Sequence, residues 1–215
     1  KKTGATGEAA QELYDIVDNL ATSIPTDFET ASNAVGEVNT RFGLTGKALA
    51  ETSKTFIEFA EINNTDLSSA INNTDSIMEK FGLDASQVDS VLGIMTATGQ
   101  KTGVSMDTLY GSLSKNGGTL KEMGLSLGQS VTLLGNLEAN GVDTATAMTA
   151  LSKANQSAVK QGKSLDTVLK DGITSIKNAK TETEALQIAT NLFGKKGATE
   201  MTQAIREGRF SVDDL

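Results

Sequence analysis

The chain has 215 residues, a formal net charge of −8, and no cysteine, histidine or tryptophan. Without histidine and cysteine, Ser-His-Asp triads, Cys-His dyads, disulfides and the usual zinc sites are excluded, so we expect no catalytic, cofactor-binding or metal-binding residue. The acidic balance argues against sequence-independent nucleic-acid binding, which depends on Lys and Arg neutralising phosphates, and no run of about 18 apolar residues could span a bilayer.

Apolar residues spaced three or four apart predict helices from Glu8 onward. The first helix follows a frayed lead-in over 1–7, ends near Pro25, and carries the stripe Leu13, Ile16, Val17 and Leu20. Thr26 or Asp27 caps the second helix, which we expect to bury Phe28, Ala31, Val35, Val38 and Phe42. The third helix starts at Thr45 and buries Leu49, Phe56, Phe59 and Ala60. It stops at the polar run 63–66, where Thr65 or Asp66 caps the fourth.

The later helices follow the same pattern. Their expected core stripes are, in chain order, Leu67, Ala70, Ile71, Ile77, Met78 and Phe81; Val88, Val91, Leu92 and Met95; Met106, Leu109, Tyr110 and Leu113; Leu120 and Met123; Val131, Leu134 and Leu137; Met148, Leu151, Ala154 and Val159; Leu165, Val168, Leu169, Ile173 and Ile176; Leu186, Ala189, Leu192 and Phe193. Asp84 with Gln87, Ser126 with Gln129, and Thr181 with Glu184 predict capping boxes. We expect Asn116-Gly117-Gly118 to weaken or break its helix. Gly194 and Gly197 should end the next-to-last helix, with a last helix over 198–207 and a further one beginning at Ser211.

Five triplets of a glycine, an apolar residue and a capping residue separate many of these helices. They are Gly43-Leu44-Thr45, Gly82-Leu83-Asp84, Gly103-Val104-Ser105, Gly124-Leu125-Ser126 and Gly141-Val142-Asp143. Glycine takes the left-handed conformation that ends a helix because it has no Cβ. The apolar residue then folds back on the last turn, and Thr, Ser or Asp accepts hydrogen bonds from the free amides of the next helix. We therefore predict a joint at each triplet.

No segment alternates apolar and polar residues over a β-branched run, so we predict no sheet. The expected fold class is all-α, with about ten to twelve short, mostly antiparallel helices joined by glycine-containing turns, in a compact array or a solenoid. We divide the chain into N-terminal helices 1–42, a repeat-like helical core 43–160 and C-terminal helices 161–215, as one continuous unit. The start at Lys1, without an initiator methionine, leads us to expect a piece of a longer protein.

Several segments, taken in order, carry a family resemblance. They are Val35–Gly46, Phe56–Ala60, Met78–Leu83, Thr98–Ser105, Leu120–Leu127, Glu138–Asp143 and Leu192–Lys196. No single segment is specific, but their order over residues 30–215 resembles the core region of tail tape measure proteins of siphophage-like tails and prophages.

The resemblance implies a protein that sets tail length by occupying the tube lumen while tube subunits polymerise around it. Such a protein is chaperoned in the bacterial cytoplasm during assembly and leaves the virion tail ahead of the DNA at infection. The implied partners are tail tube, tail-tip and tail assembly chaperone proteins, together with further copies of the chain. Nucleic-acid contact is not implied for this region, and membrane contact is implied only for other parts of the full protein.

A ruler needs a long continuous helix, which rises about 1.5 Å per residue. The regular glycine breaks therefore predict a folded domain of such a protein rather than its rod.

Five short segments resemble ligand-binding motifs and have a simpler structural interpretation as well. Gly99–Thr102 and Gly162–Ser164 resemble phosphate loops, but they lack the Walker spacing and a preceding strand, so we interpret both as helix-ending turns. The run 116–119 could cradle an anion at a helix start, though a kink is the simpler interpretation. The repeats 63–66 and 72–75 could ligate calcium, yet they lack the alternating acids and the glycine of a calcium loop, which favours a capped turn and a solvated helix face.

A cell-wall glycosidase would need two carboxylates facing each other across a cleft. Glu51, Glu58, Glu61 and Asp66 are close in sequence, but they fall on polar helix faces without aromatic neighbours. The methionines at 78, 95, 106, 123, 148 and 201 are interpreted as core residues rather than as a binding groove. We predict a non-enzymatic domain that acts through surface contacts. A helical-repeat adaptor unrelated to tails and an accessory domain of a cell-wall hydrolase remain the alternatives.

Overall fold

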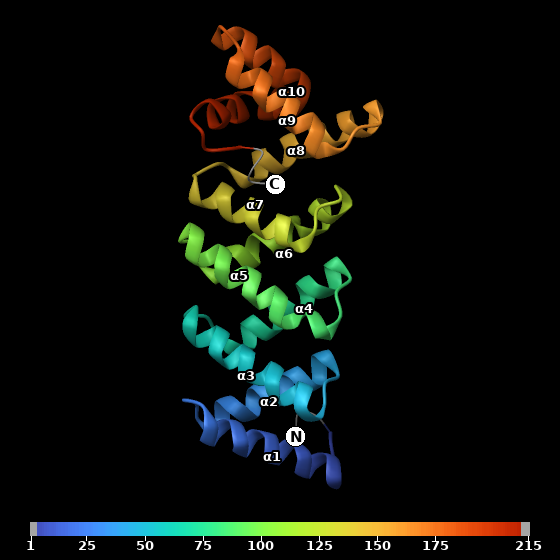
Figure 1. Cartoon of the computed structure of the whole chain (residues 1–215), viewed down its shortest axis with the longest axis vertical. Coiled ribbons are helices and arrows are strands. Elements are labelled where there is room, and N and C mark those ends of the chain that lie inside the picture. Colours follow the sequence, from blue (N-terminus) through green and yellow to red (C-terminus); the bar gives the residue numbers. More distant parts are fainter. Residues whose placement is uncertain (1–3, 212–215) are drawn as a thin grey trace. The chain divides into compact units, whose positions relative to one another are not determined.

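The computed structural model describes residues 4–211, which form ten α-helices and one short 3₁₀ turn and include no strand (Figure 1). The α-helices are α1 Glu8–Ser23, α2 Phe28–Phe42, α3 Gly46–Ile62, α4 Leu67–Phe81, α5 Val88–Thr102, α6 Met106–Glu122, α7 Leu127–Ala139, α8 Thr144–Gln161, α9 Leu165–Asn178 and α10 Glu182–Arg206; the 3₁₀ turn η1 is Ala85–Gln87. The all-α class is therefore confirmed. The helix expected from Ser211 onward lies outside the described residues.

All five predicted joints are present, and each glycine takes a positive φ, between 62° and 86°. At Gly82, Gly124 and Gly141 the following amide donates to the carbonyl five residues before it, at 2.9, 3.1 and 2.9 Å, which is the Schellman ending. At Gly43 and Gly103 the glycine's own amide bonds four residues back instead, at 3.0 and 2.8 Å. Gly162 makes a sixth joint with φ 64°, although a lysine follows it.

The capping residues mostly act as predicted. Asp84 with Gln87 and Ser126 with Gln129 close complete capping boxes. At Thr181 only half of the box forms: the Glu184 amide donates to the Thr181 hydroxyl at 3.2 Å, while the Glu184 carboxylate accepts from the Lys180 amide at 2.9 Å. Thr45 precedes α3 without any side-chain capping bond.

Residues up to Ala97 together with Ser105–Tyr110 form one compact unit, here called unit 1. Inside it α1 packs on α2 and α3, α2 on α3 and α4, and α3 on α4, so α1 and α2 each contact the two helices that follow them. The Phe56 ring is fully buried and stacks on Phe42 with a centroid separation of 5.8 Å. The Thr74 hydroxyl lies 2.8 Å from the Tyr110 hydroxyl, and both side chains are buried.

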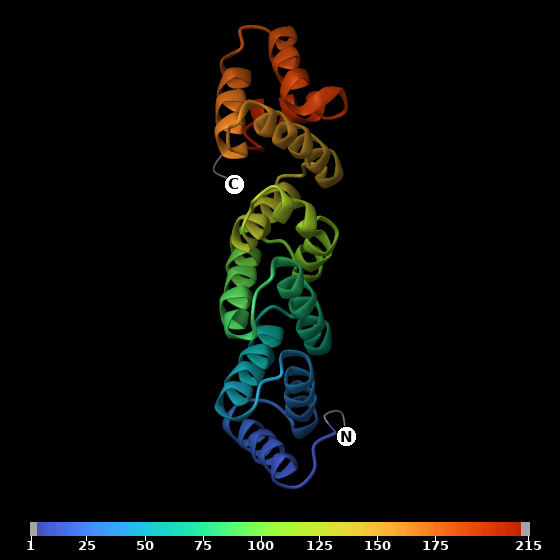
Figure 2. The same ribbon diagram turned by 90° about the vertical axis from the view of Figure 1, so that its right-hand side faces the viewer.

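Thr98–Val104 and the chain from Gly111 onward form unit 2. Here α8, α9 and α10 pack against one another and α7 packs on α8 (Figure 2). The close approach of α10 to α8 requires a glycine, because a Cβ on Gly197 would lie 2.7 Å from the Ala150 Cβ. Gly194, with φ 76°, turns the chain inside α10, so the predicted break before the last helix is a kink within one helical span. The division into 1–42, 43–160 and 161–215 stays a prediction.

Three residues predicted to lie in the core are exposed instead. Phe28 is 45% exposed, Val159 71% and Leu186 38%. The neighbours Ala158 and Ala185 are buried in their place, since residues one position apart on a helix point about 100° away from each other. Phe28 is the first residue of α2 and lies at the helix end.

The predicted break in α6 is also wrong, because this helix runs unbroken through Asn116-Gly117-Gly118. Burial of Leu113 and Leu120 on either side outweighs the poor helix propensity of two glycines, about 1 kcal/mol each. The Asn116 side-chain amide also donates to the Ser112 carbonyl inside the helix, at 3.0 Å.

Candidate interaction surface

The two phosphate-loop-like segments lie at helix ends, as predicted. Gly99–Thr102 is the last turn of α5, where the Thr102 hydroxyl donates to the Thr98 carbonyl at 2.7 Å. Gly162–Ser164 joins α8 to α9, with Ser164 capping α9 through the Thr167 amide. The run 116–119 lies inside α6 and therefore offers no free helix N-terminus for an anion.

The two Asn-Asn-Thr-Asp repeats have different environments. The first joins α3 to α4. The Asp66 carboxylate accepts from the Ser69 backbone amide at 2.8 Å, and the Asn63 side-chain amide donates to the Phe59 carbonyl at 2.9 Å. The second lies within α4, where Thr74 is buried and Asp75 pairs with Arg41 at 3.5 Å. The capped turn predicted for the first repeat is confirmed. The solvated helix face predicted for the second is wrong at Thr74, which packs inside the core.

The carboxylates weighed for glycosidase chemistry lie along α3 and just after it. Glu51 pairs with Lys47 at 3.3 Å and Glu58 with Lys54 at 3.6 Å, both as exposed pairs one helical turn apart. Within residues 4–211 no cluster of three or more Asp or Glu could hold a metal ion. No described helix combines the length and apolarity needed to cross a bilayer.

A groove of about 480 Å³ opens between α1 and α2 in unit 1. Two aromatic rings line it, Tyr14 from α1 and Phe28 from α2, with centroids 5.7 Å apart and planes tilted by 56°. Tyr14 is 58% exposed. Leu13, Val17 and Val35 supply aliphatic surface, so the lining is largely apolar. We call this the aromatic groove.

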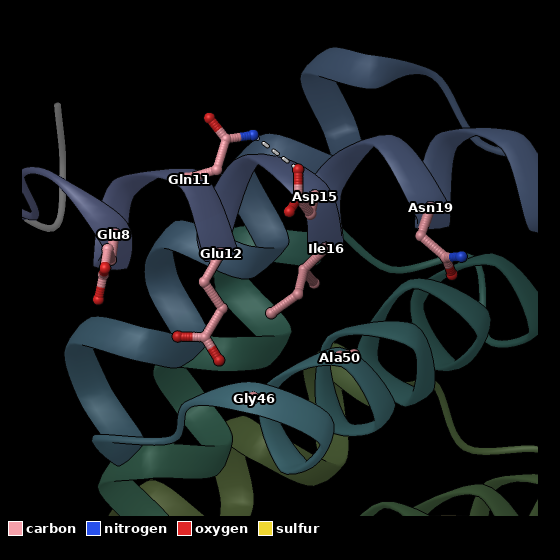
Figure 3. Close-up of a pocket in the computed structure, with 8 residues that line it drawn as sticks. All are labelled: Glu8, Gln11, Glu12, Asp15, Ile16, Asn19, Gly46 and Ala50. Atoms are coloured by element: carbon pink, nitrogen blue, oxygen red, sulfur yellow. Dashed lines mark hydrogen bonds between the residues drawn. The ribbon is translucent and has the colours of Figure 1, made fainter.

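A second groove, of about 460 Å³, lies between the other side of α1 and the start of α3. We call it the acidic groove because Glu8, Glu12 and Asp15 line it from successive turns of α1. Figure 3 shows Glu12 and Ile16 pointing from α1 toward Gly46 and Ala50, while Gln11 donates to Asp15 at 2.8 Å.

The Glu12 carboxylate also complements the start of α3. Its Oε1 atom lies 3.4 Å from where a Cβ on Gly46, the first residue of α3, would be. This helix lacks a side-chain cap at Thr45, and a nearby negative charge favours the positive end of a helix dipole. Glu12 therefore belongs both to the groove and to the packing of α1 against α3.

Asp27 adds a further negative charge where α2 begins. The Thr30 backbone amide donates to its carboxylate at 2.7 Å and the Thr30 hydroxyl at 3.1 Å, and these bonds lower the pKa of Asp27 below its usual value. This carboxylate is therefore charged at neutral pH next to Phe28.

Sequence reasoning did not find either groove. Tyr14 lies outside the predicted stripe of α1, and Phe28 was expected to be inside the core. The acidic positions 8, 12 and 15 are readable as a one-turn spacing on a helix, but the partner helices that complete each groove come from packing.

An all-α fold with grooves between its helices is typical of proteins that act by binding other proteins. Comparison with known families identifies the family of this chain. The chain matches the family described as phage-related minor tail protein over residues 14–208, and it belongs to that family. Searches of curated proteins and of solved structures found no match.

Proposed function

We propose that this phage tail protein is a tail tape measure protein, and that the present chain is one of its folded domains. The family match over residues 14–208 supports the proposal, since it includes all the segments between Val35 and Lys196 that resemble tape measure proteins. The domain takes part in tail assembly, in length determination and in DNA ejection through contacts with other proteins, without catalysis.

The short helices favour a domain that acts by binding other proteins. Helices ended by glycine joints about every twenty residues pack against one another instead of extending as a rod. Their exposed grooves are suited to tail tube, tail-tip or assembly chaperone proteins, and to further copies of the chain. The protein would meet the chaperones in the host cytoplasm during assembly and would then lie in the lumen or tip of the virion tail.

The test is genetic. Phage particles are prepared from cells in which the gene is intact, deleted, or deleted and complemented, and tail lengths are measured by electron microscopy. We expect the deletion to abolish tails or to give tubes of irregular length, and the complementing gene to restore uniform tails. Uniform tails of normal length in the deletion strain would contradict the proposal.

A second deletion tests the domain role. Removing only the codons for residues 14–208 would shorten the tail by on the order of 300 Å if this stretch were a continuous helical ruler. For a folded contact domain we expect fewer tails, with no such uniform shortening. Uniformly shortened tails would show that the stretch measures length itself, and peptidoglycan turnover by the purified chain would instead favour the hydrolase accessory domain.

A further inference from the structure

The two rings of the aromatic groove touch each other and remain open to solvent. Tyr14 and Phe28 are 58% and 45% exposed although their centroids lie only 5.7 Å apart. Aromatic side chains in such apolar openings are enriched where proteins bind one another, because they bury a large area with few rotatable bonds. The groove therefore offers an anchor site that the packing of residues 4–211 does not use.

The surroundings of this groove carry one sign of charge. Between Thr3 and Thr40 the chain has no Lys or Arg, and its seven acidic residues there are Glu8, Glu12, Asp15, Asp18, Asp27, Glu29 and Glu37. The first cation after this stretch, Arg41, pairs with Asp75 at 3.5 Å. In the part of the chain that the structure describes, no carboxylate of α1 forms an ion pair. A partner placed here meets the negative charges of α1, a helix that contains no Lys or Arg.

Acidic residues also flank the two rings. Asp18 is exposed and follows Tyr14 by one helical turn on the same face of α1, and Asp27 directly precedes Phe28, whereas Glu8, Glu12 and Asp15 lie on the other side of α1. A second helix lying along α1 and α2 repeats its own side chains at the same spacing of about 5.4 Å per turn. Its apolar face would cover Tyr14 and Phe28, and cations at its flanks would face the carboxylates of Asp18 and Asp27 beside these rings. Lys or Arg placed over either ring would gain a cation–π contact.

We propose that the aromatic groove binds an amphipathic helix of another tail protein, with apolar residues on one face and Lys or Arg beside them. The chemistry of the partner follows from the groove, whereas its origin in the phage tail rests on the proposed function. An extended strand is a weaker candidate because residues 4–211 contain no sheet edge to which it could add.

Designed peptides test the chemistry directly. Three fluorescent peptides of about 18 residues are titrated with the 215-residue chain: one with Leu at helical spacing and Lys on its flanks, one with every Lys changed to Glu, and one with the basic sequence scrambled. We expect the basic amphipathic peptide to bind at least about tenfold more tightly than the other two. Its Kd should also weaken as salt is raised, since exposed charges are screened beyond about 10 Å at 0.1 M salt. Equal binding of the acidic or scrambled peptide overturns the proposal.

Variants locate the binding site. Tyr14→Ala combined with Phe28→Ala should weaken binding of the basic peptide by at least about tenfold, because the anchoring rings are lost. Ile62→Ala combined with Val159→Ala removes exposed apolar side chains elsewhere and should leave the Kd unchanged. Thermal melts of each variant establish that the fold is kept. An unchanged Kd for the ring variant overturns the assignment of the groove.

Charge variants separate the carboxylates beside the rings from general acidity. Asp18→Asn combined with Asp27→Asn should reduce both the affinity for the basic peptide and its salt dependence, whereas Glu79→Gln combined with Asp89→Asn should change neither. Equal effects of the two pairs contradict a role for the carboxylates beside the rings.

Sedimentation velocity measures whether a second copy of the chain occupies the groove instead. A dimer of the chain that is lost with Tyr14→Ala and Phe28→Ala would mean that a second copy fills the groove, which overturns the proposal. The peptide titrations and the tail measurements test different proposals, and either can be disproved without the other. Absent peptide binding overturns the groove assignment, while normal tails after gene deletion overturn the proposed function.

Discussion

The joint at Gly124 allows a sharp test of how this chain ends its helices. Gly124 adopts φ 86°, and a Cβ built on it would meet no atom within 4 Å. In Gly124→Ala the strain therefore comes from the backbone conformation alone, with no contribution from a clash. The left-handed conformation costs an L-residue about 1–2 kcal/mol, so we expect the variant to lose that much stability.

Gly118 in α6 is the matched control, since it lies in the same unit and also has open space around its Cβ. Its backbone is helical, so Gly118→Ala should gain about 0.5–1 kcal/mol. For a chain of this size each kcal/mol shifts the melting temperature by about 2–4 °C, and the two variants should differ by roughly 3–12 °C.

Melting followed by far-UV circular dichroism measures this difference. Gly124→Asn adds a further check, because asparagine tolerates the left-handed region better than alanine and should lose less stability. If Gly124→Ala melts at or above the wild-type temperature, or if both alanine variants shift it in the same direction, then the glycine joints do not depend on backbone conformation.

Four further predictions concern packing and protonation. Gly197→Ala should lower the melting temperature, because its Cβ would lie 2.7 Å from the Ala150 Cβ and overpacking costs about 1–3 kcal/mol; an unchanged melt would contradict the close approach of α8 and α10. Thr74→Val and Tyr110→Phe should each destabilise by leaving a buried hydroxyl unpaired, while the double variant should lose less than the sum; additive losses in urea unfolding would refute the pairing. Burial also raises the pKa of Tyr110 to about 12, so the unfolded state ionises first and stability should fall as the pH rises from 10.0 toward that value, a slope that Tyr110→Phe should remove. Hydrogen bonds from Thr30, Ser69 and Thr146 lower the pKa of the capping carboxylates Asp27, Asp66 and Asp143. Stability should therefore fall as the pH drops through 3.8 and below, and Asp27→Asn, Asp66→Asn and Asp143→Asn together should keep the caps but flatten this acid slope in a dichroism titration; an unchanged slope would exclude these groups as its source.

The secondary structure could be predicted closely because its signals are local. A glycine with no Cβ, the capping side chain after it and an apolar spacing of three or four act within one or two helical turns. Gly82, Asp84 and Gln87 show this well, since the predicted ending, cap and capping box all form. The unbroken α6 marks the limit of this reasoning, because buried leucines on both sides of Gly117-Gly118 outweigh local propensity.

By itself, then, the sequence determined that the chain is helical, where most helices begin and end, and most of the residues that form the core. Tertiary structure alone decided which helices pack together, and with them the Thr74–Tyr110 pair, the Gly197–Ala150 approach and the two grooves beside α1. The physical reason is the range of the interactions. A helix end is set by hydrogen bonds among neighbouring residues, whereas Tyr14 and Phe28 form one surface only because α1 folds back on α2.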